Sequence, residues 1–72
     1  MMAEGAGRVR IAERDAAYMA RARWRTLAGQ LRDAADTAER AAGRIPQDAP
    51  ALREAAVTLR NAATIADGLA RP

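Results

Sequence analysis

Arginine dominates the chemistry available to this 72-residue chain, because all 12 of its basic side chains are arginines. At about 100° per residue, four of them fall in a narrow band along one side of a single helix, with an aromatic ring beside them. Guanidinium groups match the geometry of carboxylates and phosphates, and an aromatic ring can stack on a base. The pattern therefore predicts contact with an acidic protein surface or with nucleic acid. The residues are Arg14, Tyr18, Arg21, Arg25 and Arg32.

The arginines also have an ordinary explanation as a solvated helix face. Arg32 and Arg40 each lie four residues from Asp36, the spacing at which opposite charges pair on a helix. The formal net charge is only +3, and all of it belongs to residues 1–25, where six arginines accompany three acidic residues. The sequence therefore leaves both interpretations of the arginines open.

This composition offers few of the residue types that enzymes use for catalysis. Nucleophilic and general-base catalysis draw mostly on Ser, Cys, His and Lys, and the chain contains none of them. Asp33, Asp36 and Glu39 recur every three residues, so they sweep around a helix instead of converging on a metal ion. We therefore expect no enzyme, no metal, no cofactor and no small-molecule substrate.

The order of helix-forming and helix-breaking residues predicts an all-α fold. Residues 8–43 lack proline and are rich in Ala, Arg, Glu and Leu, which are strong helix formers. Residues 49–69 have the same character, and the segment 44–48 between them contains a proline. Residues 1–7 include two glycines and are expected to form a disordered tail. The result is a single domain, an antiparallel helical hairpin with a long first helix and a shorter second one.

Four residues around the turn are expected to end one helix and begin the next. Gly43 fits the position just after a helix, where glycine adopts a left-handed conformation, and Pro46 prevents continuation. Asp48 is suited to cap the second helix, with Pro50 in its first turn. A short loop of this kind brings the two helices side by side.

One sequence pattern occurs twice and predicts the surfaces along which the helices meet. The segment Leu31-Arg32-Asp33-Ala34-Ala35 returns 28 residues later as Leu59-Arg60-Asn61-Ala62-Ala63. On a helical wheel the repeated leucine and alanines face inward, with the arginine at the border of that face. We therefore expect the larger side chains of the hairpin core to be Trp24, Leu27, Leu31, Leu52 and Leu59.

Two groups of side chains have no place in a lone hairpin. Ile11 and Met19 fall on the side of the first helix that faces away from the predicted core. Val57, Asn61 and Ile65 belong to an uncharged strip of the second helix, although a solvated helix face is normally charged. With 21 alanines, no Cys and no His, a chain this small often relies on self-association for stability. We therefore predict an oligomer, with a dimeric four-helix bundle as the first choice.

The segment Arg8-Val9-Arg10-Ile11 alternates like a short strand. A strand followed by two helices is similar to the plan of ribbon–helix–helix proteins, and the resemblance implies a dimer that binds DNA. It covers these four residues and the order of the elements only. The helix that follows is far too long for that family, so the first turn of a long helix is the better interpretation.

These patterns predict a small protein–protein interaction module, an adaptor, inhibitor or assembly factor that docks through helix faces. In this interpretation Val57, Asn61 and Ile65 contact a second copy, whereas Ile11, Met19 and the arginine band contact another protein. The alternatives are a nucleic-acid-binding regulatory hairpin dimer and a component of a virion or other assembly. The chain lacks a signal peptide and the ~20-residue apolar run of a membrane span, so we expect a cytoplasmic protein. Its composition, rich in Arg and Ala without Lys, is typical of a high-GC bacterium or its phage.

Overall fold

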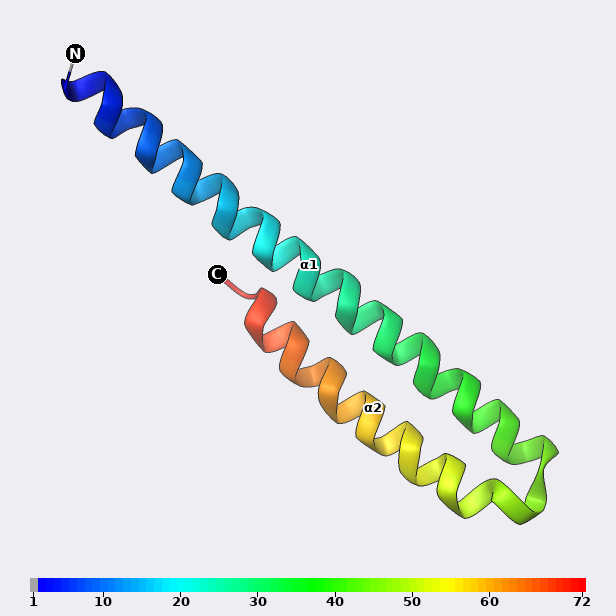
Figure 1. Cartoon of the computed structure of the whole chain (residues 1–72). Helices are drawn as coiled ribbons and strands as arrows, with labels where there is room; N and C mark the ends of the chain where they lie inside the picture. Colours follow the sequence, from blue (N-terminus) through cyan, green and yellow to red (C-terminus); the bar gives the residue numbers. More distant parts are fainter. Residues whose placement is uncertain (1) are drawn as a thin grey trace.

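The fold is all-helical, with two helices packed against each other as a hairpin. The structure, a computed structural model, describes the backbone of residues 2–72 and the side chains from residue 13 onward. Helix α1 spans Met2–Arg44, the 3-10 turn η1 spans Pro46–Asp48, and helix α2 spans Ala49–Ala70. Figure 1 shows α2 lying antiparallel along the second half of α1, while the first half of α1 continues beyond the end of α2. The principal-axis extents are 68 × 14 × 12 Å.

α1 begins earlier than the sequence pattern indicates. Its first residue is Met2, so residues 2–7, expected to form a disordered tail, belong to the helix. That expectation rests on Gly5 and Gly7, and each glycine disfavours a helix by about 1 kcal/mol. The residues around them are Met, Ala and Glu, which favour a helix, and no proline ends it. The alternating segment 8–11 is likewise helical and forms no strand.

The turn between the helices satisfies its backbone groups in a different way from the one predicted. Gly43 lies inside α1, and no described glycine has a positive φ, so the expected left-handed glycine cap is wrong. The chain leaves α1 through a 2.9 Å hydrogen bond from the Ile45 N–H to the Ala41 carbonyl. Asp48 precedes α2, but its side chain makes no capping hydrogen bond. Pro50 lies in the first turn of α2, as predicted.

Alanines alone form the buried core of the hairpin. Among the described residues every buried side chain is an alanine, and no larger side chain is fully buried. Seven of these alanines follow one another at intervals of seven residues, three in α1 and four in α2. This spacing keeps one face of a helix turned toward its neighbour, as in coiled coils, and small side chains let the two helices lie close together. The seven are Ala28, Ala35, Ala42, Ala49, Ala56, Ala63 and Ala70, and Ala66 is an eighth buried alanine.

The large side chains that were expected to fill the core lie at its margins. Trp24 and Leu27 each remain 38% exposed, so their assignment to the core is wrong. Leu31, Leu52 and Leu59 are partly buried, and Leu31 packs against the alanines. An expectation based on side-chain size places the tryptophan and the leucines in the core. In two closely packed helices, however, the central positions accept only small side chains.

The first half of α1 has no neighbouring helix in the described part of the chain. The end of α2 lies beside Arg25, so the preceding part of α1 projects alone (Figure 1). We call residues 2–23 the projecting segment. Helices in proteins gain most of their stability from packing one face rather than from propensity. The projecting segment is therefore the part of the molecule that has most to gain from a partner.

Candidate interaction surfaces

One edge of the hairpin is closed by ion pairs between the helices. Arg32 of α1 donates to Asp67 of α2, and Arg60 of α2 donates to Glu39 and Asp36 of α1. The distance from Arg60 Nη2 to Asp36 Oδ1 is 3.0 Å. We call these five residues the charged edge. The two arginines thus lie at the border of the inner face, where the repeated sequence pattern places them.

The ion pairs of the charged edge shift the pKa values of both partners. The hydrogen bond from Arg32 lowers the pKa of Asp67, and the hydrogen bond from Arg60 lowers the pKa of Glu39. In return, hydrogen bonds to the carboxylates raise the pKa of Arg32 and of Arg60. All four groups are therefore held in their charged forms, and the edge favours one register of the two helices.

The predicted band of arginines divides into a structural part and an exposed part. Arg32 belongs to the charged edge. Arg14, Arg21 and Arg25, which we call the arginine stripe, form no ion pair within the part of the chain whose side chains are described. Tyr18 lies beside them and is 58% exposed. Arg14, Arg25 and Tyr18 are exposed, whereas Arg21, which precedes the buried Ala28 by seven residues, is half-buried.

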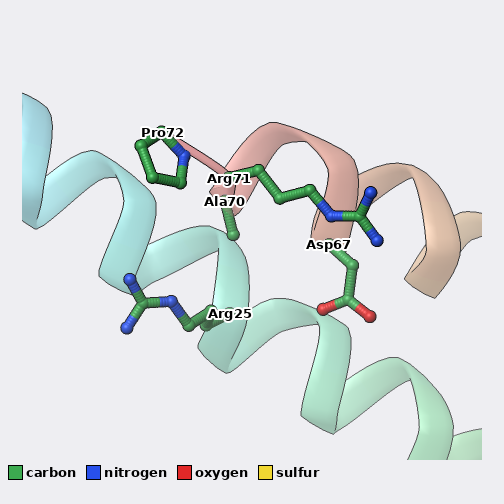
Figure 2. A pocket seen from close by; sticks show the side chains of 5 residues that line it. All are labelled: Arg25, Asp67, Ala70, Arg71 and Pro72. Atoms are coloured by element: carbon green, nitrogen blue, oxygen red, sulfur yellow. The ribbon is translucent and has the colours of Figure 1, made fainter.

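A notch opens where α2 ends against α1. Figure 2 shows its lining, with Arg25 from α1, Asp67 and Ala70 from α2, and Arg71 and Pro72 from the residues after α2. The notch has a volume of about 290 Å³. The Arg25 side chain points away from Asp67 in this view, whereas the Arg71 side chain runs back toward it. Because the Asp67 carboxylate lines the notch beside Arg71, the notch is a poor site for an anion.

Along α1 and α2 the opposite edge of the hairpin carries no charge, and Asp48 of the turn is the charged residue at its end. Arg32, on the charged edge, follows the buried Ala28 by four positions. The residues just before the buried alanines fall on the other flank of each helix. On that flank Leu27 and Leu69 remain 38% and 51% exposed, and the alanines between them are exposed or partly buried. We call this line the apolar edge. It consists of Leu27, Ala34 and Ala41 of α1 and Ala55, Ala62 and Leu69 of α2.

The apolar edge leads into a hollow on the surface of α1. Ala20, Arg23, Trp24 and Leu27 line this hollow, and its volume is about 350 Å³. We call it the central hollow, because it lies at the middle of α1. Ala20 precedes Leu27 by seven residues and so continues the spacing of the apolar edge. The hollow is therefore an apolar surface with one guanidinium group at its rim.

The uncharged strip predicted on the second helix lies on the surface of the hairpin. Val57 and Ile65 are 57% and 66% exposed, and Asn61 between them is also exposed. Thr58 and Thr64 donate their hydroxyl groups to carbonyls of their own helix. We call these five residues the outer strip. β-branched residues have low helix propensity in water, so a contact surface explains the strip better than a solvated face does.

Two further predicted contact residues belong to α1. Met19 is 52% exposed on the projecting segment. Ile11 lies outside the residues whose side chains are described. In the described part of the chain, no group of three His, Cys, Asp or Glu residues could hold a metal ion. Over the same residues, no helix combines the length and the apolar character that a bilayer crossing requires.

The fold and its surfaces define a class of protein, a helical hairpin with an alanine core and large apolar side chains on the outside. Comparisons with models of protein families, with curated proteins and with solved structures found no match for this chain. The surfaces are therefore assigned from their geometry and chemistry.

The apolar edge and the central hollow were not identified from the sequence. Their signal is a second seven-residue spacing, one position before the alanines of the core. A helical wheel merges the two lines into one broad inner face. Only the ion pairs between the helices identify which flank is closed and which is left open.

Proposed function

We propose that this protein is a small helical protein–protein interaction module, an adaptor, inhibitor or assembly factor that docks through helix faces. The observation that carries the proposal is the distribution of apolar side chains by size, with alanines inside and larger residues outside. Tyr18, Met19, Val57 and Ile65 are each more than half exposed. Alanines inside and larger apolar residues outside are the reverse of the usual arrangement, and exposed apolar area of this kind is found at interaction sites.

The functional form that we propose is a dimer in which two hairpins contribute four helices to one bundle. Hydrophobic free energy scales with the apolar area buried, so an alanine core contributes less of it than a leucine core of the same length. A second copy would add the missing area. The exposed apolar side chains of α2, among them Ile65 and Leu69, support this proposal.

The outside partner that we propose is a protein with an acidic surface. Tyr18 and Met19 offer apolar contact on the projecting segment, next to Arg14 and Arg21 of the arginine stripe. Tyrosine and arginine are enriched among the residues that contribute most to binding energy. The combination of these side chains on one exposed helix favours docking of a negatively charged protein.

This proposal is tested by capture from a lysate of the source cell, followed by binding measurements on the purified captured protein. We expect the Tyr18→Ala/Met19→Ala variant to bind at least about tenfold more weakly than the wild type. Thr26→Ala, at another exposed position of α1, is the control and should bind like the wild type. If the captured protein binds all three chains equally well, the proposed docking surface is wrong.

Nucleic-acid binding is a second candidate function, favoured by the three arginines of the arginine stripe, which pair with no described acidic residue. Affinity based on phosphate contacts should fall steeply with salt. Replacing Arg14, Arg21 and Arg25 together by glutamine should reduce the slope of log affinity against log salt by about 0.9 per lost contact. Arg44→Gln is the control. If mixed DNA and RNA do not bind at low salt, this candidate is excluded.

A further inference from the structure

We propose that two copies of this protein pair through their apolar edges, with the two α1 helices antiparallel and the twofold axis passing through the central hollow. The inference rests on the proposed function only in requiring a dimer, and it specifies a face other than the outer strip. Each projecting segment then lies in the groove beside the hairpin of the other copy.

The central hollow lies where such an axis has to be. α1 spans residues 2–44, so its midpoint is residue 23, and the hollow is lined by Ala20, Arg23, Trp24 and Leu27. A twofold dimer joins one surface patch to the same patch on the other copy. When two equal helices lie antiparallel along their full length, the axis crosses both at their midpoints. The hollow therefore provides an apolar, self-facing contact at the required level.

The lengths of the helices agree with this arrangement. α1 has 43 residues and α2 has 22, so α2 covers about half of α1 and leaves a segment of similar length projecting (Figure 1). In the antiparallel pair, each projecting segment lies beside the hairpin half of the other copy. The four helices of the dimer then form one bundle in which each level contains three of them, namely both α1 helices and one α2. No part of either α1 is left without a neighbour.

The seven-residue spacing of the apolar edge fixes the register of the pair. With the axis between Arg23 and Trp24, inside the hollow, Leu27 of one copy lies opposite Ala20 of the other, so a large side chain meets a small one, as close packing requires. Trp24 lies opposite Arg23 of the other copy, where a guanidinium group can lie over the indole ring. Further along, Ala34 faces Glu13 of the other copy.

The distribution of charge favours a second copy as the occupant of this edge. The apolar edge contains no charged residue. Arg14 and Arg21 continue the line of the buried alanines, about 100° around α1 from the apolar edge, so they lie beside the proposed contact and not at its centre. Ile65 borders the apolar edge, whereas Val57 and Asn61 lie further around α2 and stay accessible to another protein.

The surface of the single chain is large enough for such an interface. Its accessible area is 5736 Å², whereas a compact protein of the same 7.7 kDa mass exposes roughly 4,300 Å². The excess of about 1,400 Å² is larger than the roughly 800 Å² per partner that a stable interface buries. Pairing along the apolar edge would therefore bring the molecule close to ordinary compactness.

Disulfide cross-linking tests the register directly, because the natural chain contains no cysteine. In the Ala20→Cys/Leu27→Cys variant the two cysteines of one chain are about 10 Å apart along the helix, too far to bond to each other. We expect mild oxidation to convert this variant to a covalent dimer on a non-reducing gel. The Arg14→Cys/Arg21→Cys variant has the same spacing on the other side of α1 and should stay monomeric. If both variants cross-link equally, or if neither does, the proposed pairing is wrong.

Substitutions that introduce one charge distinguish this dimer from a dimer formed through the outer strip. In Ala34→Glu the new carboxylate faces Glu13 of the other copy, so like charges lie opposite each other. This variant should weaken dimerisation about tenfold or more. Ala34→Arg should weaken dimerisation less. Asn61→Glu, on the outer strip, should leave the dimer unchanged. If only Asn61→Glu disrupts the dimer, the apolar edge is excluded as the interface, but the dimer proposed as the functional form is retained. If the wild-type chain is monomeric, both the pairing and the proposed dimer fail.

Discussion

At the scale of single residues, alanine determines how this hairpin is held together. A buried alanine at every seventh position lets two helices approach closely, but it supplies little apolar area. The free energy of unfolding should therefore depend on close approach of the backbones. Extra side-chain volume at these positions is expected to push the helices apart.

We predict that Ala35→Leu and Ala63→Leu each lower the free energy of unfolding by about 1–3 kcal/mol, because both side chains are fully buried. Urea unfolding followed by circular dichroism measures this change. Ala51→Leu, at an exposed position of α2, is the control and should change the value by less than about 0.5 kcal/mol. Equal stability of the core and control variants would contradict the alanine core.

The charged edge predicts a loss of stability in acid. The arginine partners lower the pKa of Asp67 and of Glu39 in the folded chain, so both carboxyl groups bind protons more readily after unfolding. Their stabilising contribution is fully present above roughly pH 4.3, the upper of the two ordinary pKa values. It is lost as the pH falls through the lowered folded values.

Thermal unfolding between neutral and strongly acidic pH tests this expectation. The melting temperature of the wild type should decrease once the pH is lowered past roughly 4. The Glu39→Gln/Asp67→Asn variant should show a smaller fall, because it lacks the two shifted groups. Asp33→Asn removes a carboxylate outside the charged edge and should follow the wild-type curve. Coincident curves for the wild type and the double variant would rule out this role of the edge.

At the scale of elements, the hairpin itself was predictable from local residue preferences. Strong helix formers run without proline up to Pro46, and this pattern is enough to place one break between two helices. The cap at Gly43 was predicted wrongly, because the chain leaves α1 through backbone hydrogen bonds that need no left-handed residue. The beginning of α1 was missed because two glycines suggested an end that the neighbouring residues override.

The interaction surfaces were predictable only in part, because they depend on contacts between the helices. The exposed positions of Tyr18 and Val57 follow from the helical wheel alone. The margin positions of Trp24 and Leu27 do not, because they depend on the flank at which α2 packs and on the point at which it ends. The ion pair between Arg32 and Asp67 supplies that information, and it joins residues 35 positions apart.

We predict that Gly29→Ala raises the free energy of unfolding by about 1 kcal/mol, because this glycine lies inside a helix. It has no positive φ, and a Cβ atom at this position would meet nothing within 4 Å. Chemical denaturation of the two chains measures the difference. An unchanged or lower free energy of unfolding would mean that another chain packs against this side of α1, which the proposed dimer leaves open.

At the scale of the whole molecule, the single chain is extended for its length. Its radius of gyration is 19.1 Å, whereas a compact protein of 72 residues has one of about 11 Å. An alanine core, an uncharged edge and a projecting segment are all accounted for if the folded unit is two chains rather than one. Tyr18 and Val57 remain exposed outside the proposed pairing and are the side chains that the proposed docking of another protein would use.

The most direct test of this two-chain unit is the mass of the protein in solution, measured by light scattering and sedimentation equilibrium at micromolar concentration. We predict twice the chain mass of 7.7 kDa for the wild type and for Asn61→Glu, with Ala34→Glu shifted toward the single-chain mass. A wild-type chain that is monomeric at these concentrations and still melts cooperatively would contradict the proposal that a second copy completes the hairpin.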